Sequence, residues 1–444
     1  GEEELKFNFQ DGLITIYLLD QVPINRISSI KIFYSGKPQE AKNPPWDGGF
    51  VWETDSLNRP WIGVSCEGIG ASTWWPTTND ISDKADVVNI NVTIPKTEDS
   101  LQVVCNGELK NMVHHQDSVT YQWGVSYPIT NYNVTLNIGV FEQFQTKYSS
   151  QSGLSFPLDY YVLDYHIKQA KKHFRQVPKV LNVFEEMYGN YSFPNDGYAL
   201  VETSYWGMEH QGAISYGNHF KNDVLGFDFI ILHESAHEYW GNAVGISDFA
   251  DLWINEAFAT YTETLFFEHV YSKEIAFKYL KFQQQYIKNT EVLVGKLGEN
   301  HDFETTDIYY KGAWMLHTIR TALNDDDVFF KVLKEIQQSY KYRTITTNEV
   351  LTIFGKHISS FDVKAIFTHY LYNIEYPRLS YSIRKKKQKE LFSYQWAKVS
   401  GAFNLPIWIK VDGVIRSVKP QEKVFGDKIE VLWLDNYLIS TKAD

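Results

Sequence analysis

Hydrophobic and polar residues alternate over short stretches in the first third of the chain. From residue 5 to about residue 144, β-branched and aromatic residues predict strands at 13–17, 30–34, 87–92 and 134–138. Clusters of Gly, Pro and Asn separate these strands, and no helical period is found there. The pattern predicts an N-terminal all-β domain, residues 1–148, in which two sheets pack face to face.

The hydrophobic period changes near Leu158. Apolar residues at helical spacing from Val162 to Val177 predict a helix that Pro178 ends, and a second helix at 179–188 ends before Gly189. A strand is predicted at 197–203. Further helices are predicted at 223–241, from about 251 onwards, and at 273–290, 308–324, 327–340, 347–357 and 361–372. This part is predicted to be a mainly α domain, residues 149–388.

Alternating strand patterns return after Leu391, at 407–411 and 429–433. They predict a small C-terminal β domain, residues 389–444. The basic run at 384–387 and the preceding Pro377 are interpreted as a solvated linker before it. The predicted fold class is therefore multidomain α+β.

Charge and cysteine content narrow the classes of function. A formal net charge of −12 argues against nucleic-acid binding, which needs clustered Lys and Arg. With only Cys66 and Cys105, a disulfide framework and a cysteine-based zinc finger are both excluded. No apolar run reaches the ~20 residues of a transmembrane segment. The start at Gly1 is interpreted as processing or trimming, which leaves the compartment open between export and the cytoplasm; the oligomeric state is open too.

The motif HESAH at 233–237 lies in a predicted helix and carries the candidate chemistry. Because His233 and His237 are four residues apart, their imidazoles point to the same side of the helix and can bind one zinc ion. Glu234 lies beside that ion without having to bind it, and is the candidate general base. The alternative is that both histidines are ordinary core residues.

A third ligand is needed to complete such a site, and Glu256 is the candidate. It follows His237 after 18 residues, in a predicted helix with apolar neighbours, where a carboxylate is normally paired or bound to metal. Glu263, two turns further along the same face, is predicted to hydrogen-bond a ligand histidine. The alternative for Glu263 is a plain solvent-facing acid. The cofactor predicted from these residues is Zn²⁺, one ion per chain.

The segments HESAHEYWGN and LWINEAFATYTE resemble the metal-binding segments of the zinc aminopeptidases of the aminopeptidase N and leukotriene hydrolase group. The resemblance implies a thermolysin-like catalytic domain, although thermolysin-type peptidases have a longer gap between the second histidine and the glutamate. The family usually carries a helical C-terminal domain over its cleft, and without it we expect a more open cleft.

Three further segments carry the resemblance and imply substrate contacts. At 207–211, Gly207 and Met208 precede Glu209, which matches the family's anchor for a free α-amino group; His210 stands where the family usually has Asn. Tyr309, before Lys-Gly-Ala, matches the tyrosine that donates to the oxyanion. Glu67 matches a second amine anchor from the first domain.

The activity implied by the resemblance is removal of the N-terminal residue from peptides that have a free N-terminus. Two rivals remain open from the sequence. One is another zinc hydrolase, an endopeptidase or an epoxide hydrolase; the other is a metal-bearing scaffold that binds peptides without turnover.

Overall fold

The computed structural model describes residues 3–67, 70–78, 80–299 and 303–443, which divide into two compact units, Gly1–Lys37 and Pro38–Asp444. The first unit contains an antiparallel hairpin of β1 (Lys6–Gln10) and β2 (Leu13–Tyr17). The predicted strand at 30–34 is wrong, because these residues have no strand partner and all five are exposed. Their β-branched side chains favour extended backbone, but a strand also needs a hydrogen-bonded neighbour.

The second unit begins with two sheets and continues into a third. The order β3-β4-β9-β6 joins Gly49–Thr54, Pro60–Ser65, Leu136–Gly139 and Gln102–Cys105. The order β5-β8-β7 joins Val88–Pro95, Ser118–Val125 and Glu108–His114. Single-turn helices η1 and η2 occupy Ala71–Thr73 and Asn131–Asn133. Cys66 and Cys105 are buried free thiols.

A five-stranded mixed sheet connects this β region to the helices. Its order is β10-β11-β12-β14-β13, with bounds Phe141–Ser149, Ser155–Leu163, Tyr198–Glu202, Ile214–Tyr216 and Gly207–Met208. The helix predicted across Val162 is wrong, because β11 continues to Leu163 and pairs with strands on both sides. The helical segment then consists of the short elements η3 (Asp164–His166), α1 (Ile167–His173) and η4 (Phe174–Gln176).

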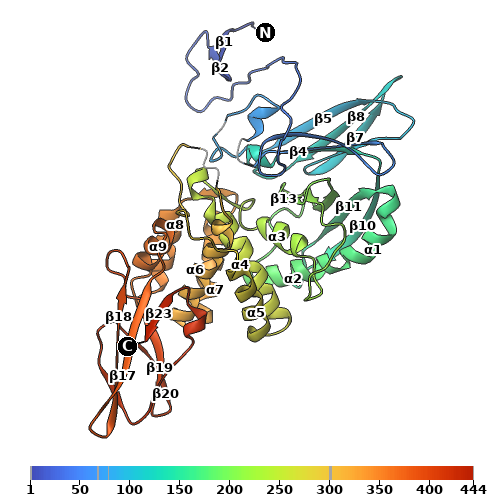
Figure 1. Cartoon of the computed structure of the whole chain (residues 1–444). Coiled ribbons are helices and arrows are strands. Elements are labelled where there is room, and N and C mark those ends of the chain that lie inside the picture. Colours follow the sequence, from blue (N-terminus) through green and yellow to red (C-terminus); the bar gives the residue numbers. More distant parts are fainter. Residues whose placement is uncertain (1–2, 68–69, 79, 300–302, 444) are drawn as a thin grey trace. The chain divides into compact units, whose positions relative to one another are not determined.

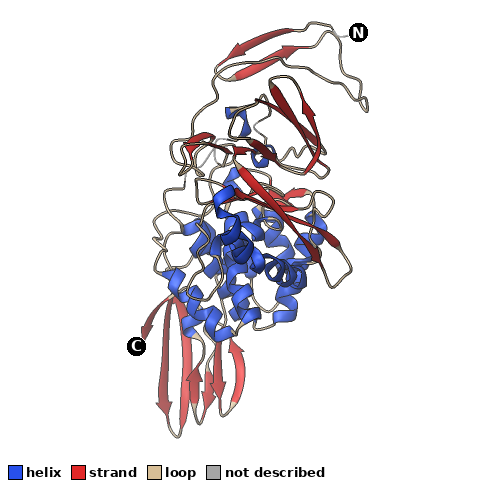
Figure 2. Ribbon diagram, turned by 90° about the vertical axis from the view of Figure 1, so that its right-hand side faces the viewer, coloured by secondary structure: helices blue, strands red, loops and turns tan. Residues whose placement is uncertain are grey.

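The helices form the middle of the second unit, between β sheets at either end (Figure 2). They are α2 (Val177–Tyr188), α3 (Phe229–His237), η5 (Phe249–Asp251), α4 (Trp253–Val270), α5 (Lys273–Gln284), α6 (Asp307–Leu323), α7 (Asp326–Tyr340), α8 (Thr347–His357) and α9 (Val363–Tyr372). The parallel pair β15 (Val244–Ile246) and β16 (Arg343–Ile345) lies among them. The predicted helices at 273–290 to 361–372 are confirmed as α5 to α9, although α5 ends at Gln284.

Two sheets complete the chain. One has the order β21-β18-β17-β23, with bounds Val424–Gly426, Lys389–Ala397, Arg378–Lys386 and Ser440–Ala443. The other has the order β20-β19-β22, with bounds Val414–Val418, Ile407–Val411 and Ile429–Val431, and η6 (Leu434–Asn436) follows. The linker interpretation of 384–387 is wrong, because β17 contains residues 384–386.

The multidomain α+β class with a helical centre is confirmed. The predicted boundaries after residues 148 and 388 remain predictions; the first falls within β10 and the second at the turn between β17 and β18. One continuous apolar core runs through the second unit from Phe50 to Leu438. Within the described residues, no helix is long and apolar enough to cross a membrane.

Helix α4 is buried on nearly all sides, and its contact with α6 depends on a glycine. A Cβ atom added to Gly312 would lie 2.4 Å from the Cβ of Ala257, so the two helices can approach this closely only without a side chain at 312. This contact fixes the start of α6, where Tyr309 lies, against the helix that carries Glu256.

Replacing Gly312 by Ala is therefore expected to lower the free energy of unfolding by about 1–3 kcal/mol, the usual cost of overpacking a core. Thermal unfolding measures this. The matched control is Gly355→Ala on α8, where the new methyl meets the flexible end of Lys364 at 3.1 Å. The control should be neutral or slightly stabilising. Equal stability of the two variants would contradict the packing explanation.

Candidate metal centre

The two histidines of helix α3 direct their imidazole rings toward the same place. The helix starts later than predicted, at Phe229, because Asp228 caps it by accepting a hydrogen bond from the Ile230 amide at 3.0 Å. It also ends at His237 rather than near residue 241. The Nε2 atoms of His233 and His237 lie 3.1 Å apart. Because i and i+4 residues share a helix face, this geometry follows from the spacing in the sequence.

Helix α4 lies beside α3 and brings a carboxylate to the same point (Figure 1). The Oε2 atom of Glu256 is 3.3 Å from His233 Nε2 and 3.5 Å from His237 Nε2. The three residues are buried, and their ligand atoms all lie within 4.8 Å of one another. Among the described residues, this is the one group of three or more potential ligands gathered so closely.

The donor set fits a cation. Nδ1 of His233 lies 2.8 Å from Glu263 Oε1, and Nδ1 of His237 lies 2.9 Å from the Trp240 carbonyl oxygen. Since both acceptors need a proton on Nδ1, both Nε2 atoms are left with lone pairs that face each other. The Oε2 atom of Glu256 also accepts no hydrogen bond from the described residues. Two imidazole Nε2 atoms and one carboxylate oxygen that converge in a buried place suit Zn²⁺, which takes imidazole and carboxylate ligands and displaces the protons that these groups bind in its absence.

Charge coupling within this cluster is strong. Burial would raise the pKa of Glu256, but His237 and His233 outweigh it and lower that pKa to about 2. Burial would lower the pKa of His237, but the carboxylate of Glu256 raises it to about 9. The site is thus built to hold positive charge between the imidazoles and the carboxylate.

Glu263 lies where the sequence predicted it, next to a histidine of the cluster. Its Oε1 atom accepts from His233 Nδ1, while Oε2 accepts from the Tyr279 hydroxyl at 2.5 Å and from Gln283 Nε2 at 2.9 Å. Tyr279 and Gln283 come from α5 and were missed by the sequence analysis. The pattern predicted that helix but not which of its faces meets α4.

Glu234 is buried against the edge strand β13. A Cβ atom on Gly207 would lie only 2.4 Å from Glu234 Oε1, so the strand backbone can pass this close only at a glycine. Burial raises the pKa of Glu234 to about 7, against the lowering effect of His233 and His237. Met208, the other residue of β13, is also buried.

Glu209, in the segment that follows β13, is held by contacts from the N-terminal β region and from the turn after α3. The Tyr132 hydroxyl donates to Glu209 Oε1 at 3.1 Å, and the side-chain amides of Asn133 and Asn242 donate to its carbonyl oxygen at 3.1 and 2.9 Å. The sequence analysis assigned no role to these three residues: Tyr132 and Asn133 lie outside every motif, and Asn242 ends the segment HESAHEYWGN without being a candidate ligand. Tyr132 could have been suspected only from its place in a turn of the β domain.

Glu67 brings a further carboxylate to this region from the end of β4. Its side chain is buried, and its pKa is raised well above the ordinary value by burial and by the charges of Glu209, Glu256 and Glu234. Acids from distant parts of the chain therefore converge beside the cluster. Such a concentration of buried negative charge favours a cationic ligand group.

Tyr309 lies at the start of α6, and its ring centroid is 5.8 Å from that of His233. Burial and the charges of Glu256, Glu67, Glu209 and Glu234 raise the pKa of its hydroxyl well above the ordinary value. The hydroxyl therefore stays protonated near neutral pH and is able to donate a hydrogen bond.

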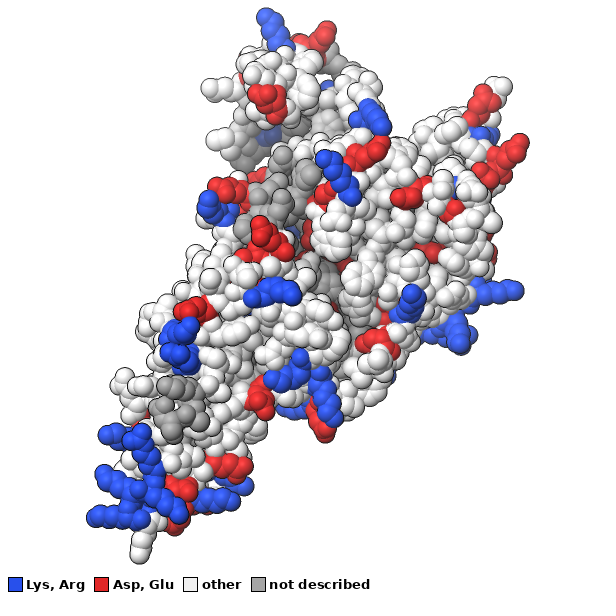
Figure 3. Space-filling model, viewed as in Figure 1, with Lys and Arg blue, Asp and Glu red and all other residues white. Residues whose placement is uncertain are grey.

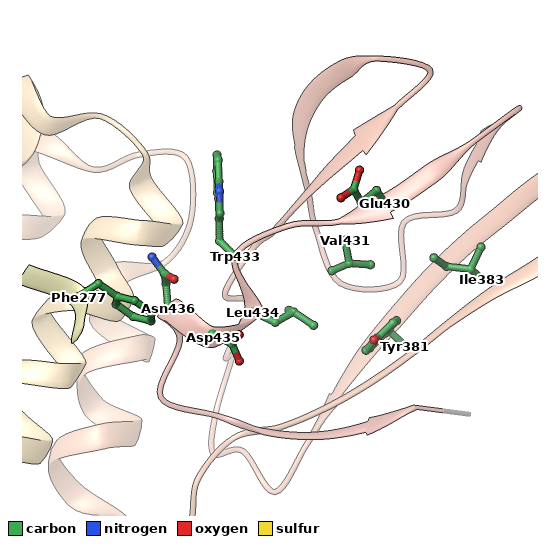
Figure 4. Close-up of a pocket in the computed structure, with 9 residues that line it drawn as sticks. All are labelled: Phe277, Tyr381, Ile383, Glu430, Val431, Trp433, Leu434, Asp435 and Asn436. Atoms are coloured by element: carbon green, nitrogen blue, oxygen red, sulfur yellow. The ribbon is translucent and has the colours of Figure 1, made fainter. Parts of the chain in front are cut away.

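Two features near the sequence motifs and on the surface are separate from the cluster around His233: the His210 side chain and the cavity described next. His210 is fully buried with its Nδ1 atom 3.0 Å from Ser215 Oγ, so its side chain contacts β14. A cavity of about 620 Å³ lies elsewhere, at α5 and the C-terminal sheets, with lining residues that include Phe277, Tyr381 and Trp433 (Figure 4). None of the residues that line this cavity belongs to the cluster around His233.

Comparison with known proteins identifies a family domain in the middle of the chain. Residues 173–370, which contain α3, α4 and Tyr309, match the model of the peptidase family M1 domain. The chain carries a peptidase family M1 domain. The predicted resemblance to the zinc aminopeptidases is thereby confirmed, and with it the assignment of Zn²⁺ as the cofactor of the family.

The curated relatives of this chain are distant in sequence. The probable aminopeptidase 2 of Sulfurisphaera tokodaii is 24% identical over 353 residues, which cover 72% of this chain and 43% of the relative. Aminopeptidase N of Haemophilus influenzae is 23% identical over 242 residues, which cover 50% of this chain and 27% of the relative. The chain thus spans less than half the length of these relatives.

A solved structure shares the fold. The M1 zinc metallopeptidase of Deinococcus radiodurans, solved as a mutant bound to a Tyr-Ser-Ala substrate, aligns with a TM-score of 0.64 at 17% identity. The alignment covers 77% of this chain and 75% of that chain. At this identity the likeness concerns the fold.

Proposed function

We propose that this protein is a zinc-dependent aminopeptidase that removes the N-terminal residue from peptides. One observation supports this proposal most strongly. The buried carboxylates of Glu209 and Glu67 lie beside the cluster of the two histidines and Glu256. A metal cluster alone fits many hydrolases, whereas buried acids beside it favour a substrate with a cationic end.

In the proposed mechanism, His233, His237 and Glu256 hold one zinc ion. When bound there, zinc supplies Lewis acidity that polarises the scissile carbonyl and makes water a stronger nucleophile. Glu263 keeps the His233 ring oriented through its contact with Nδ1.

Glu234 moves the proton in this mechanism. Its carboxylate takes a proton from water as the oxygen attacks the carbonyl carbon, and then delivers it to the departing amide nitrogen. The close passage of Gly207 prevents the carboxylate from swinging away from the cluster on that side. The Tyr309 hydroxyl donates a hydrogen bond to the carbonyl oxygen as negative charge develops there.

The α-ammonium group of the substrate is held by Glu209, with Glu67 as a second anchor. Because the ammonium is fixed, the first peptide bond comes to the cluster and bonds further along the chain do not. The Tyr132 hydroxyl orients the Glu209 carboxylate through Oε1. The substrates are therefore peptides with a free N-terminus.

Comparing a peptide that has a free N-terminus with its N-acetylated form tests this function. Acetylation removes the positive charge and adds bulk at the anchor, so we expect kcat/KM to fall by about 100-fold or more. Equal turnover of the two peptides would contradict the amine anchor and favour an endopeptidase.

Glu209→Gln tests the same anchor by changing the protein instead of the substrate. Loss of the carboxylate charge is expected to raise KM for the free peptide by about 10–100-fold, since a charged hydrogen bond contributes about 1.5–3 kcal/mol. The matched control is Glu202→Gln, a buried acid that contacts His166 instead. That variant should lose stability but keep its KM. An unchanged KM in Glu209→Gln would remove Glu209 from the anchor.

A further inference from the structure

The charges of this chain are segregated along the sequence. Residues 378–444 carry 13 Lys and Arg against 7 Asp and Glu, whereas residues 1–377 carry 29 against 47. The C-terminal sheets are therefore basic in a protein that is otherwise acidic. Figure 3 shows Lys and Arg side chains gathered over these sheets, at one end of the second unit.

The register of the hairpin β17–β18 gathers the basic residues further. Lys386 pairs with Lys389, and Arg384 pairs with Leu391, which in turn pairs with Phe425 of β21. Directly paired residues share a face of a sheet, and alternate residues along a strand return to it. Arg384, Lys386, Lys389 and Phe425 thus lie on one face, which we call the basic hairpin face.

The basic hairpin face is open to solvent and lacks compensating charge. Its three cations are exposed, and the Phe425 side chain is 50% exposed. Among the described residues, none of the three cations forms an ion pair with an acid. The nearby Glu390 pairs in register with Lys385 on the opposite face and accepts a hydrogen bond from the Ile429 amide. Like charges in adjacent strands destabilise a sheet, so the arrangement favours an anionic ligand.

We propose that the basic hairpin face binds an anionic lipid surface and so attaches the protein to membranes peripherally. Cations around an exposed phenylalanine match a bilayer surface, where phosphate groups lie above the acyl boundary. The position of the cavity shown in Figure 4 agrees with this, because Tyr381 and Ile383, which line it, lie on the opposite face of β17. A pocket for a small ligand is therefore on the other side. The acidic remainder of the protein would be repelled from the same membrane. The protein would therefore meet the membrane with its basic hairpin face.

Vesicle co-sedimentation of the full chain tests this proposal. We expect binding to phosphatidylcholine vesicles that contain about one-third phosphatidylglycerol, no binding to phosphatidylcholine alone, and loss of binding at high salt. Each basic residue next to such a surface strengthens binding about fivefold, so the triple variant Arg384→Gln, Lys386→Gln, Lys389→Gln should bind about 100-fold more weakly. Phe425→Ser should weaken binding several-fold with less effect on the salt dependence.

The matched control removes three exposed lysines elsewhere, with Lys172→Gln, Lys331→Gln and Lys334→Gln, and should bind vesicles like the wild type. All variants should keep amino-acyl amide turnover and thermal stability, which shows that they fold. Equal sedimentation with neutral and anionic vesicles, or equal loss in the control, would overturn the proposal. Tighter binding to duplex DNA than to the anionic vesicles would overturn it in favour of a nucleic-acid partner.

Discussion

Glu234→Gln is expected to lower kcat for an amino-acyl amide by about two to four orders of magnitude, the usual contribution of a general base. Glutamine has nearly the same shape, so it fits beside Gly207, but its amide cannot accept the proton from water. Zinc content should stay at one ion per chain, because Glu234 is not one of the three side chains that converge on the metal position. Steady-state kinetics together with elemental analysis measure both quantities.

The control for this variant is Glu185→Gln. Glu185 is another acid that accepts hydrogen bonds, from the Tyr148 hydroxyl and the Tyr191 amide, but it belongs to α2 and contacts none of the site residues. Its replacement should change stability and leave kcat near the wild-type value. A Glu234→Gln protein that turns over substrate at the wild-type rate would refute the assignment of the base.

Glu256→Gln should raise the dissociation constant for zinc by at least about 100-fold, and activity should fall with metal occupancy. The substitution removes the one negatively charged ligand of the cluster, whose charge balances the two imidazoles. Titration with a competing chelator measures the affinity. Excess zinc should restore part of the activity, which separates metal loss from misfolding.

Glu263→Gln is the graded comparison for this effect. Glu263 contacts a ligand histidine but not the metal position, so its loss should weaken zinc binding by about 10–100-fold, less than the loss of Glu256. Zinc binding should therefore weaken more in Glu256→Gln than in Glu263→Gln. Zinc binding that is unchanged in Glu256→Gln, or weakened more in Glu263→Gln, contradicts this order.

The convergence of His233, His237 and Glu256 could be predicted from the sequence because its geometry is mostly local. The four-residue spacing of His233 and His237 fixes both imidazoles on one helix face whatever surrounds the helix. Glu256 and Glu263 lie two turns apart on one helix, so they meet α3 together once the two helices pack. Tyr309 and Glu209 were placed by resemblance to a family, and the structure brings both to the cluster.

Contacts between distant segments could not be predicted in the same way. Tyr132 meets Glu209 across 77 residues of sequence, and Asn242 meets its backbone across 33. These contacts depend on how the β region packs on the helices, which no periodicity encodes. The prediction of a helix across Val162 was wrong for a related reason. The apolar residues from Leu158 to Leu163 suit either a helix or a strand. The segment forms a strand because it pairs with β10 and β12.

The most direct test of the account is a zinc titration of the metal-free protein while hydrolysis of an amino-acyl amide is followed. We expect negligible hydrolysis without zinc, a linear rise in rate with added zinc, and saturation at one ion per chain. A rate that does not depend on zinc, or no hydrolysis when one zinc ion is bound per chain, would contradict this expectation.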